Sequence, residues 1–152
     1  MTSKTKLFYQ TTPLISFGIN NSEKQENKMQ KLIEIQHKNF DYNDANKKEL
    51  HTVGKKALRA LAKELNLEKG TYEVRSCLGG IAVAGEIILH TDKFYLQIHS
   101  QTFGGSGLRV LYRTCKGTKD YCGGPNQYVE LDDFFTKNFI NKLRNMQEKE
   151  TA

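Results

Sequence analysis

The sequence predicts a single α+β domain, in which an antiparallel β-sheet of about four to five strands is flanked by an amphipathic basic helix on its N-terminal side and by a C-terminal helix. The 152 residues are near the usual size of one domain. Helical periodicity runs through residues 44–66, and strand-like runs rich in β-branched and aromatic residues follow it. We expect an extended polar N-terminal arm (1–30), the α+β domain (31–147) and a disordered tail (148–152).

The arm is predicted from its composition. A short apolar patch, LFYQTTPLISFGI, precedes the polar run NNSEKQENK, which has too few apolar residues to sustain a core. In the following KLIEIQHKNFDY, Ile33, Ile35 and His37 alternate with polar residues, which favours a half-buried strand over a helix. We therefore expect the domain to begin with a strand.

A helix is expected from Asp44, which can cap its N-terminus, to about Asn66. Its apolar residues have the i, i+3, i+4, i+7 spacing of one buried face, and they are Leu50, Val53, Ala57, Leu58, Leu61 and Leu65. Five cations fall on the opposite face, namely Lys48, Lys55, Lys56, Arg59 and Lys63. The helix should therefore pack on one side and present positive charge on the other.

Four strands are predicted next, in TYEVRSCL, GGIAVAGEIILH, KFYLQIHS and LRVLYRTC. A two-residue hairpin loop at Thr91 and Asp92 would pair Leu89 with Phe94. QYVEL then predicts a short last strand.

A C-terminal helix is expected to start at a cap formed by Asp132 or Asp133 and to reach about Met146. Its apolar stripe consists of Phe135, Phe139, Leu143 and Met146.

Positive charge is concentrated in two segments. The net charge is +6 and the pI is about 9.2. Residues 47–63 carry six cations against Glu49 alone, and residues 109–119 carry four cations and no acid. Such clusters favour a polyanionic partner such as nucleic acid, although a solvated cationic face has the same composition.

The N-terminus has no continuous apolar segment with a cleavage site, and no run approaches the roughly 18 apolar residues that cross a bilayer. We therefore expect a cytoplasmic protein without a membrane partner. The three cysteines, Cys77, Cys115 and Cys122, are odd in number and widely spaced, so free thiols are expected.

The stretch RTCKGTKDYCGGPN, residues 113–126, allows three interpretations. A zinc site is disfavoured because six residues separate Cys115 from Cys122, whereas paired zinc ligands are usually separated by about two to four. A phosphate cradle would use Arg113, Lys116 and Lys119 beside glycine amides, although no nucleotide-binding P-loop pattern is present. The third interpretation is a long loop whose glycines only set turn geometry.

The strands that precede this loop suggest a second binding surface. Tyr95, Gln97 and His99 share one face of their strand, and Arg109 and Arg113 share one face of the next. If the two sets lie on the same face of the sheet, they would form a platform on which single-stranded bases stack and phosphates pair. An ordinary solvent-facing sheet surface carries similar residues.

We expect a small non-enzymatic nucleic-acid-binding or nucleic-acid-associated accessory protein, without cofactor, metal or catalytic residues. Its histidines are scattered, and no serine nucleophile motif is present. The expected nucleic-acid contacts are Lys48, Lys55, Lys56, Arg59, Lys63, Tyr95, His99, Arg109, Arg113, Lys116 and Lys119. The alternative is a structural or protein-interaction component, for example of a viral particle or mobile element or an inhibitor of a host factor, whose N-terminal arm binds a partner.

Overall fold

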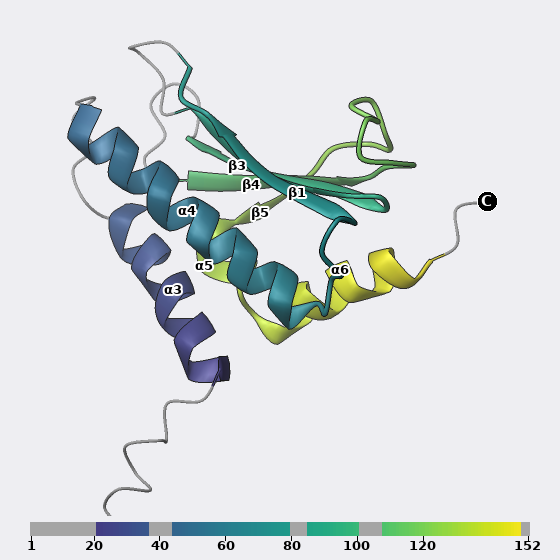
Figure 1. The fold of residues 1–152 in the computed structure, drawn as a ribbon, viewed down its shortest axis with the longest axis horizontal. Coiled ribbons are helices and arrows are strands. Elements are labelled where there is room, and N and C mark those ends of the chain that lie inside the picture. Colours follow the sequence, from purple (N-terminus) through teal and green to yellow (C-terminus); the bar gives the residue numbers. More distant parts are fainter. Residues whose placement is uncertain (1–20, 37–43, 80–84, 101–107, 150–152) are drawn as a thin grey trace, which may run out of the picture.

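The computed structural model describes residues 21–36, 44–79, 85–100 and 108–149. They form one α+β domain in which all the helices lie on the same side of an antiparallel sheet (Figure 1). The predicted fold class is therefore confirmed. The first 20 residues of the expected arm and residues 150–152 of the expected tail lie outside the described residues.

The sheet is a meander in which each strand pairs with the next, in the order β1-β2-β3-β4-β5. Its strands are β1 (Tyr72–Cys77), β2 (Glu86–Thr91), β3 (Phe94–Ser100), β4 (Leu108–Thr114) and β5 (Gln127–Glu130). All four pairings are antiparallel.

The β2–β3 hairpin differs from the predicted register. Leu89 pairs with Leu96 instead of Phe94, so the turn residues are Asp92 and Lys93. The hydroxyl of Thr91 explains the shift, because it accepts hydrogen bonds from the backbone N–H of Lys93 at 3.0 Å and of Phe94 at 2.9 Å. Thr91 is therefore the residue before the turn. The shift is two residues, which leaves every side chain on its predicted face.

The expected strand at Ile33 and Ile35 was wrong, because both residues lie in helix α3 (Asn21–Gln36). Met29, Leu32 and Ile35 are buried, and α3 packs on the next helix, α4. The expected boundary at residue 30 therefore falls inside a helix, and residues 21–30 belong to the folded domain.

Helix α4 (Asp44–Glu64) confirms the predicted basic helix, and it packs on α3 and on strands β1 and β2. It approaches β2 closely at Gly54, where an added Cβ would collide with the side chain of Ile87. A larger residue at position 54 would therefore require the buried Ile87 side chain to shift.

The C-terminal region forms two helices instead of one, α5 (Leu131–Phe134) and α6 (Lys137–Glu148). The cap of α6 is Thr136, whose hydroxyl accepts the backbone N–H of Phe139 at 3.3 Å, so the expected caps Asp132 and Asp133 were wrong. α5 contacts β4 and β5, and α6 contacts β3.

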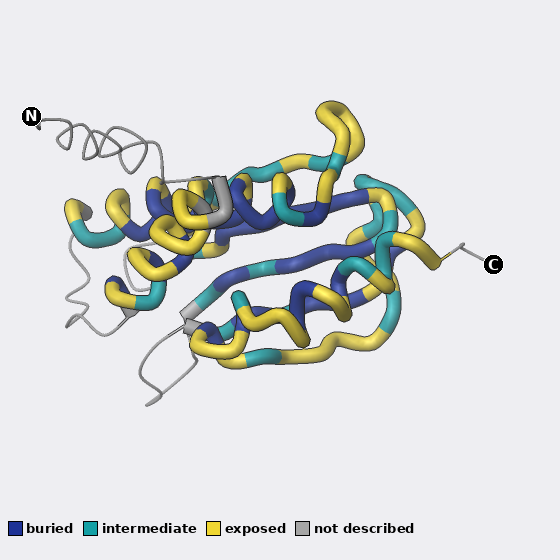
Figure 2. Tube along the Cα trace, turned by 90° about the horizontal axis from the view of Figure 1, so that it is seen from below, coloured by how far each residue is buried: buried dark blue, intermediate teal, exposed yellow. Residues whose placement is uncertain are grey.

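The core lies between the helices and one face of the sheet, where Figure 2 shows the buried parts of strands and helices facing each other. None of the helices in the described ranges is both long and apolar enough to span a membrane. The other face of the sheet, called the open face below, carries Arg75, His90, Tyr95, His99, Arg109 and Arg113.

Candidate nucleic-acid interface

Helix α4 presents the predicted cations to solvent. Lys48, Lys56, Arg59 and Lys63 are exposed, and Lys55 is half-buried. Within the described ranges, none of these five side chains makes an ion pair with a carboxylate. Their charge is therefore available to an external anion. We call these five residues the α4 basic face.

Helix α3 adds three lysines that the sequence analysis missed. Lys24, Lys28 and Lys31 are exposed and recur at i, i+4 and i+7, which places them on one side of α3. A groove of about 270 Å³ between α3 and α4 is lined by Asn27, Lys28, Lys31, Val53 and Lys56. This basic groove thus brings three lysines together without a carboxylate in its lining. The spacing of the α3 lysines was a usable signal, but it was missed because Lys24 and Lys28 were read as part of an arm and Lys31 as part of a strand.

The open face confirms one geometric expectation. Tyr95 pairs with Arg113, and His99 pairs with Arg109, so these residues do share one face of the sheet. Their exposure, however, differs from that of a stacking platform: Tyr95 is 7% exposed and Arg113 is 6% exposed. Two of the expected contacts are therefore inaccessible to a base or a phosphate.

Arg113 is buried because a loop folds back over it. The loop of residues 115–126, called the Tyr121 loop below, crosses part of the open face. Arg113 donates a hydrogen bond from Nη2 to the carbonyl oxygen of Tyr121 at 2.6 Å. Its guanidinium carbon also lies 4.2 Å from the centroid of the Tyr95 ring. These contacts tether the loop to β3 and β4.

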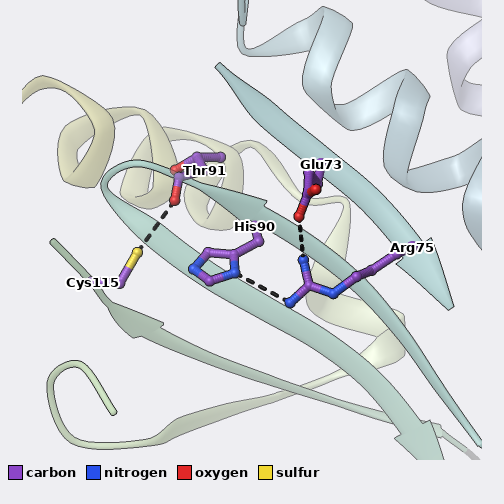
Figure 3. Close-up of polar contacts among 5 residues, drawn as sticks. All are labelled: Glu73, Arg75, His90, Thr91 and Cys115. Atoms are coloured by element: carbon purple, nitrogen blue, oxygen red, sulfur yellow. Dashed lines mark hydrogen bonds and ion pairs between the residues drawn. The ribbon is translucent and has the colours of Figure 1, made fainter. Parts of the chain in front are cut away.

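His90 lies fully buried at the centre of this assembly. Its Nδ1 lies 3.3 Å from Nη2 of Arg75, whose Nη1 lies 2.8 Å from the carboxylate of Glu73 (Figure 3). The rings of Tyr95 and Tyr121 meet the His90 ring edge-on, with centroids at 5.1 Å and 5.5 Å. Burial lowers the pKa of His90 below its ordinary value, as does the charge of Arg75, while the backbone of Gly117 acts in the opposite direction. Neutral His90 can accept a hydrogen bond from the Arg75 guanidinium. This contact links strand β1 to strand β2.

Arg109 and His99 lie near the other end of the open face, and both are half-buried. The guanidinium carbon of Arg109 lies 4.7 Å from the ring centroid of Tyr128, and its Nε lies 3.8 Å from a carboxylate oxygen of Glu130. The nearby carboxylate reduces the attraction of Arg109 for a phosphate.

The Tyr121 loop resembles a phosphate-binding loop, but the carboxylate of Asp120 already accepts the backbone N–H groups that would bind a phosphate. Asp120 accepts backbone N–H groups from Lys116 at 2.9 Å, Cys122 at 3.0 Å and Gly123 at 2.9 Å. These three hydrogen bonds lower the pKa of Asp120 from 3.8 to about 2. A phosphate would have to displace this carboxylate. Lys116 and Lys119 remain exposed at the loop surface.

Glycine is required at position 123 of the loop. Its φ is +25°, and an added Cβ would collide with the carbonyl oxygen of Thr114. Gly123 therefore sets turn geometry, as the third interpretation of this stretch expects, whereas a Cβ added at Gly117 would meet no atom within 4 Å.

The cysteines are not gathered into a metal site in the described part of the chain, where no group of three or more potential ligands occurs. Cys115 is buried and its thiol donates to the carbonyl oxygen of Thr91 at 3.3 Å, as Figure 3 shows. Burial raises the pKa of this thiol. Cys77 and Cys122 are exposed free thiols.

The two predicted cationic regions lie on opposite sides of the molecule. The α4 basic face points away from the sheet, whereas the Tyr121 loop lies over the open face, on the far side of the sheet from α4 (Figure 1). The sequence-based list of contacts therefore divides into an exposed helical set and a largely internal sheet set.

Comparisons with protein-family models, with curated proteins and with solved structures find no match to this chain.

Proposed function

We propose that this chain is a non-enzymatic nucleic-acid-binding protein that holds the phosphate backbone with the α4 basic face and the adjoining basic groove. The observation that supports this most directly is the set of five α4 cations without an ion-pair partner in the described ranges. A cation that is already paired with a carboxylate contributes little to the binding of a phosphate. An unpaired cation contributes electrostatic attraction and the release of counterions from the nucleic acid.

The strength of such binding follows from the number of phosphates that are contacted. The four exposed cations of α4 together with Lys28 and Lys31 give six side chains. If each meets one phosphate, the affinity falls by roughly three orders of magnitude between 50 and 200 mM salt. Non-specific nucleic-acid binding in the micromolar range is a reasonable expectation for a surface of this kind.

The open face and the Tyr121 loop have a smaller part in this proposal. Arg113 and Tyr95 are used within the protein, and Arg109 lies beside Glu130. Lys116 and Lys119 can add long-range attraction, but neither lines the basic groove, and Lys116 lies instead beside Met146 and Lys149. We therefore assign the primary contact to α4.

His90 is the residue whose surroundings come nearest to a catalytic arrangement, since Arg75 and Glu73 line up behind its ring. A general acid or base must reach a proton of the substrate, and His90 is fully buried beneath the Tyr121 ring. This burial supports a binding function over an enzymatic one.

The test is a binding measurement by fluorescence anisotropy at about 50 mM salt, where phosphate contacts are strong. The double variant K56E/R59E reverses two exposed cations of α4, and K116E/K119E makes the same charge change at two exposed lysines of the Tyr121 loop. We expect the first variant to lose binding and the second to retain most of it. Equal loss in both variants would show a general charge effect, and no binding by the unmodified protein would refute the proposal.

A further inference from the structure

We infer that the surface formed by α3 and α4 binds double-stranded nucleic acid in preference to single strands, through the phosphate backbone alone. This inference rests on the proposed function and names its substrate class. It reverses the sequence-based expectation that aromatic residues of the strands make a single-strand platform.

The first argument is the chemistry of the surface. Neither α3 nor α4 contains a phenylalanine, tyrosine or tryptophan, and the one histidine in the two helices, His51, is buried. Proteins that hold single strands generally stack the unpaired bases on aromatic side chains. The α3 and α4 surface offers cations for phosphates and no ring for a base.

The second argument is the position of the aromatic side chains. In the described ranges, the large exposed aromatic residues are Tyr121 and Tyr128, and neither lies on α3 or α4. Tyr121 lies over the open face against His90, on the side of the sheet opposite to α4. A single strand held by α4 could not reach that ring without passing around the sheet.

The third argument is the regular spacing of the charges. The rise of an α-helix places Lys48 and Lys63 about 22 Å apart along α4. Lys28 and Lys31 of α3 face Lys56 of α4 across the basic groove, so cations line both of its sides. A rigid array of this length can follow the regular phosphates of a duplex, whose backbone is already ordered. A single strand must lose conformational freedom to match the same array, and no stacking offsets that cost.

The first experiment compares a mixed-sequence duplex of about 20 base pairs with each of its separated strands, as DNA and as RNA, by anisotropy at about 100 mM salt. We expect one or both duplexes to bind about tenfold or more tightly than their strands. The DNA and RNA arms show which duplex is preferred, and either preference supports the inference. Equal or tighter binding of single strands overturns it while leaving the proposed function intact. Failure of all six probes to bind overturns both.

A second experiment adds the missing ring. Thr52 is exposed on α4 and lies within one turn of Lys48, Lys55 and Lys56. The variant T52Y places an aromatic ring among these cations, and T52Q is the control of similar reach without a ring. We expect T52Y to raise single-strand affinity about fivefold or more while duplex affinity stays close to that of T52Q. If T52Y leaves single-strand affinity at the T52Q value, the absence of stacking is not what sets the preference, and the inference is overturned.

Discussion

The guanidinium of Arg113 lies 4.2 Å above the ring of Tyr95 and donates at 2.6 Å to the carbonyl oxygen of Tyr121. These contacts join strands β3 and β4 to a loop that folds back across the sheet. An arginine and a tyrosine on neighbouring strands have the composition of a nucleic-acid-binding surface, but here both side chains are buried. Their contribution is therefore to stability, and the available positive charge lies on the helices.

Replacing Arg113 tests this assignment. The variant R113L removes the donor to the Tyr121 carbonyl and the cation above Tyr95, so we expect unfolding to be easier by about 2–3 kcal/mol. R113K keeps the charge but loses the planar guanidinium and should recover only part of that stability. Urea unfolding gives both values. Full stability in R113L together with lost nucleic-acid binding would return Arg113 to the interface.

His90 should make stability depend on pH. Its pKa in the folded state lies below the ordinary value of 6.5, because burial and Arg75 disfavour the imidazolium. The unfolded chain therefore binds a proton first, and stability that is complete above about pH 6.5 is lost as the pH falls below that value. H90N keeps an acceptor for Arg75 but cannot titrate. Denaturant midpoints measured from pH 7.5 to 5 should fall less steeply for H90N than for the unmodified protein, and parallel curves would contradict the assignment.

Asp120 should control the order of the Tyr121 loop. In D120A, the amides of Lys116, Cys122 and Gly123 lose their acceptor, so we expect their hydrogen exchange to accelerate about tenfold or more. D120N retains one acceptor oxygen and is the control. In the unmodified protein, these contacts should be complete above pH 3.8 and be lost as the pH falls toward 2. Unchanged exchange in D120A would show that the glycines alone hold the loop.

Truncation distinguishes the arm from the helix that follows it. Removing residues 1–30 deletes buried Met29 and leaves six residues of α3, too few to form a stable helix. We expect a loss of about 3 kcal/mol or more, since Leu32 and Ile35 would no longer be held against α4. Removing residues 1–20 retains all of α3 and is the matched control. Equal stability of the two truncated chains, measured by thermal unfolding, would contradict the packing role of α3.

The periodic elements could be predicted from sequence because their patterns are local. The stripe of α4 required only the spacing of its leucines, and the faces of β2 and β3 survived a register error of two residues because side chains alternate with period two. Helix α3 was missed because Ile33 and Ile35 alternate like a strand, while Met29 lies in a run that composition alone had assigned to the arm. Met29, Leu32 and Ile35 recur every three residues, and this spacing indicated the helix correctly.

The candidate site was only partly predictable, because burial on the open face depends on residues far apart in the chain. Tyr121 reaches His90, Arg75 and Arg113 only after four strands have formed, and no local pattern shows that contact. The role of Asp120 could have been predicted from the sequence. An aspartate whose side chain accepts the backbone N–H groups two and three residues later is typical of a turn. The exposure of the α4 cations followed directly from helix geometry.

The most direct test of the central claim is the salt dependence of duplex binding. The slope of log K against log salt concentration counts the phosphates that the protein neutralises. We predict a slope of about −5 for the unmodified protein, a slope of smaller magnitude by about two for K56A/R59A, and little change for K116A/K119A. A slope near zero, or an equal reduction in both variants, would contradict binding through the α4 basic face.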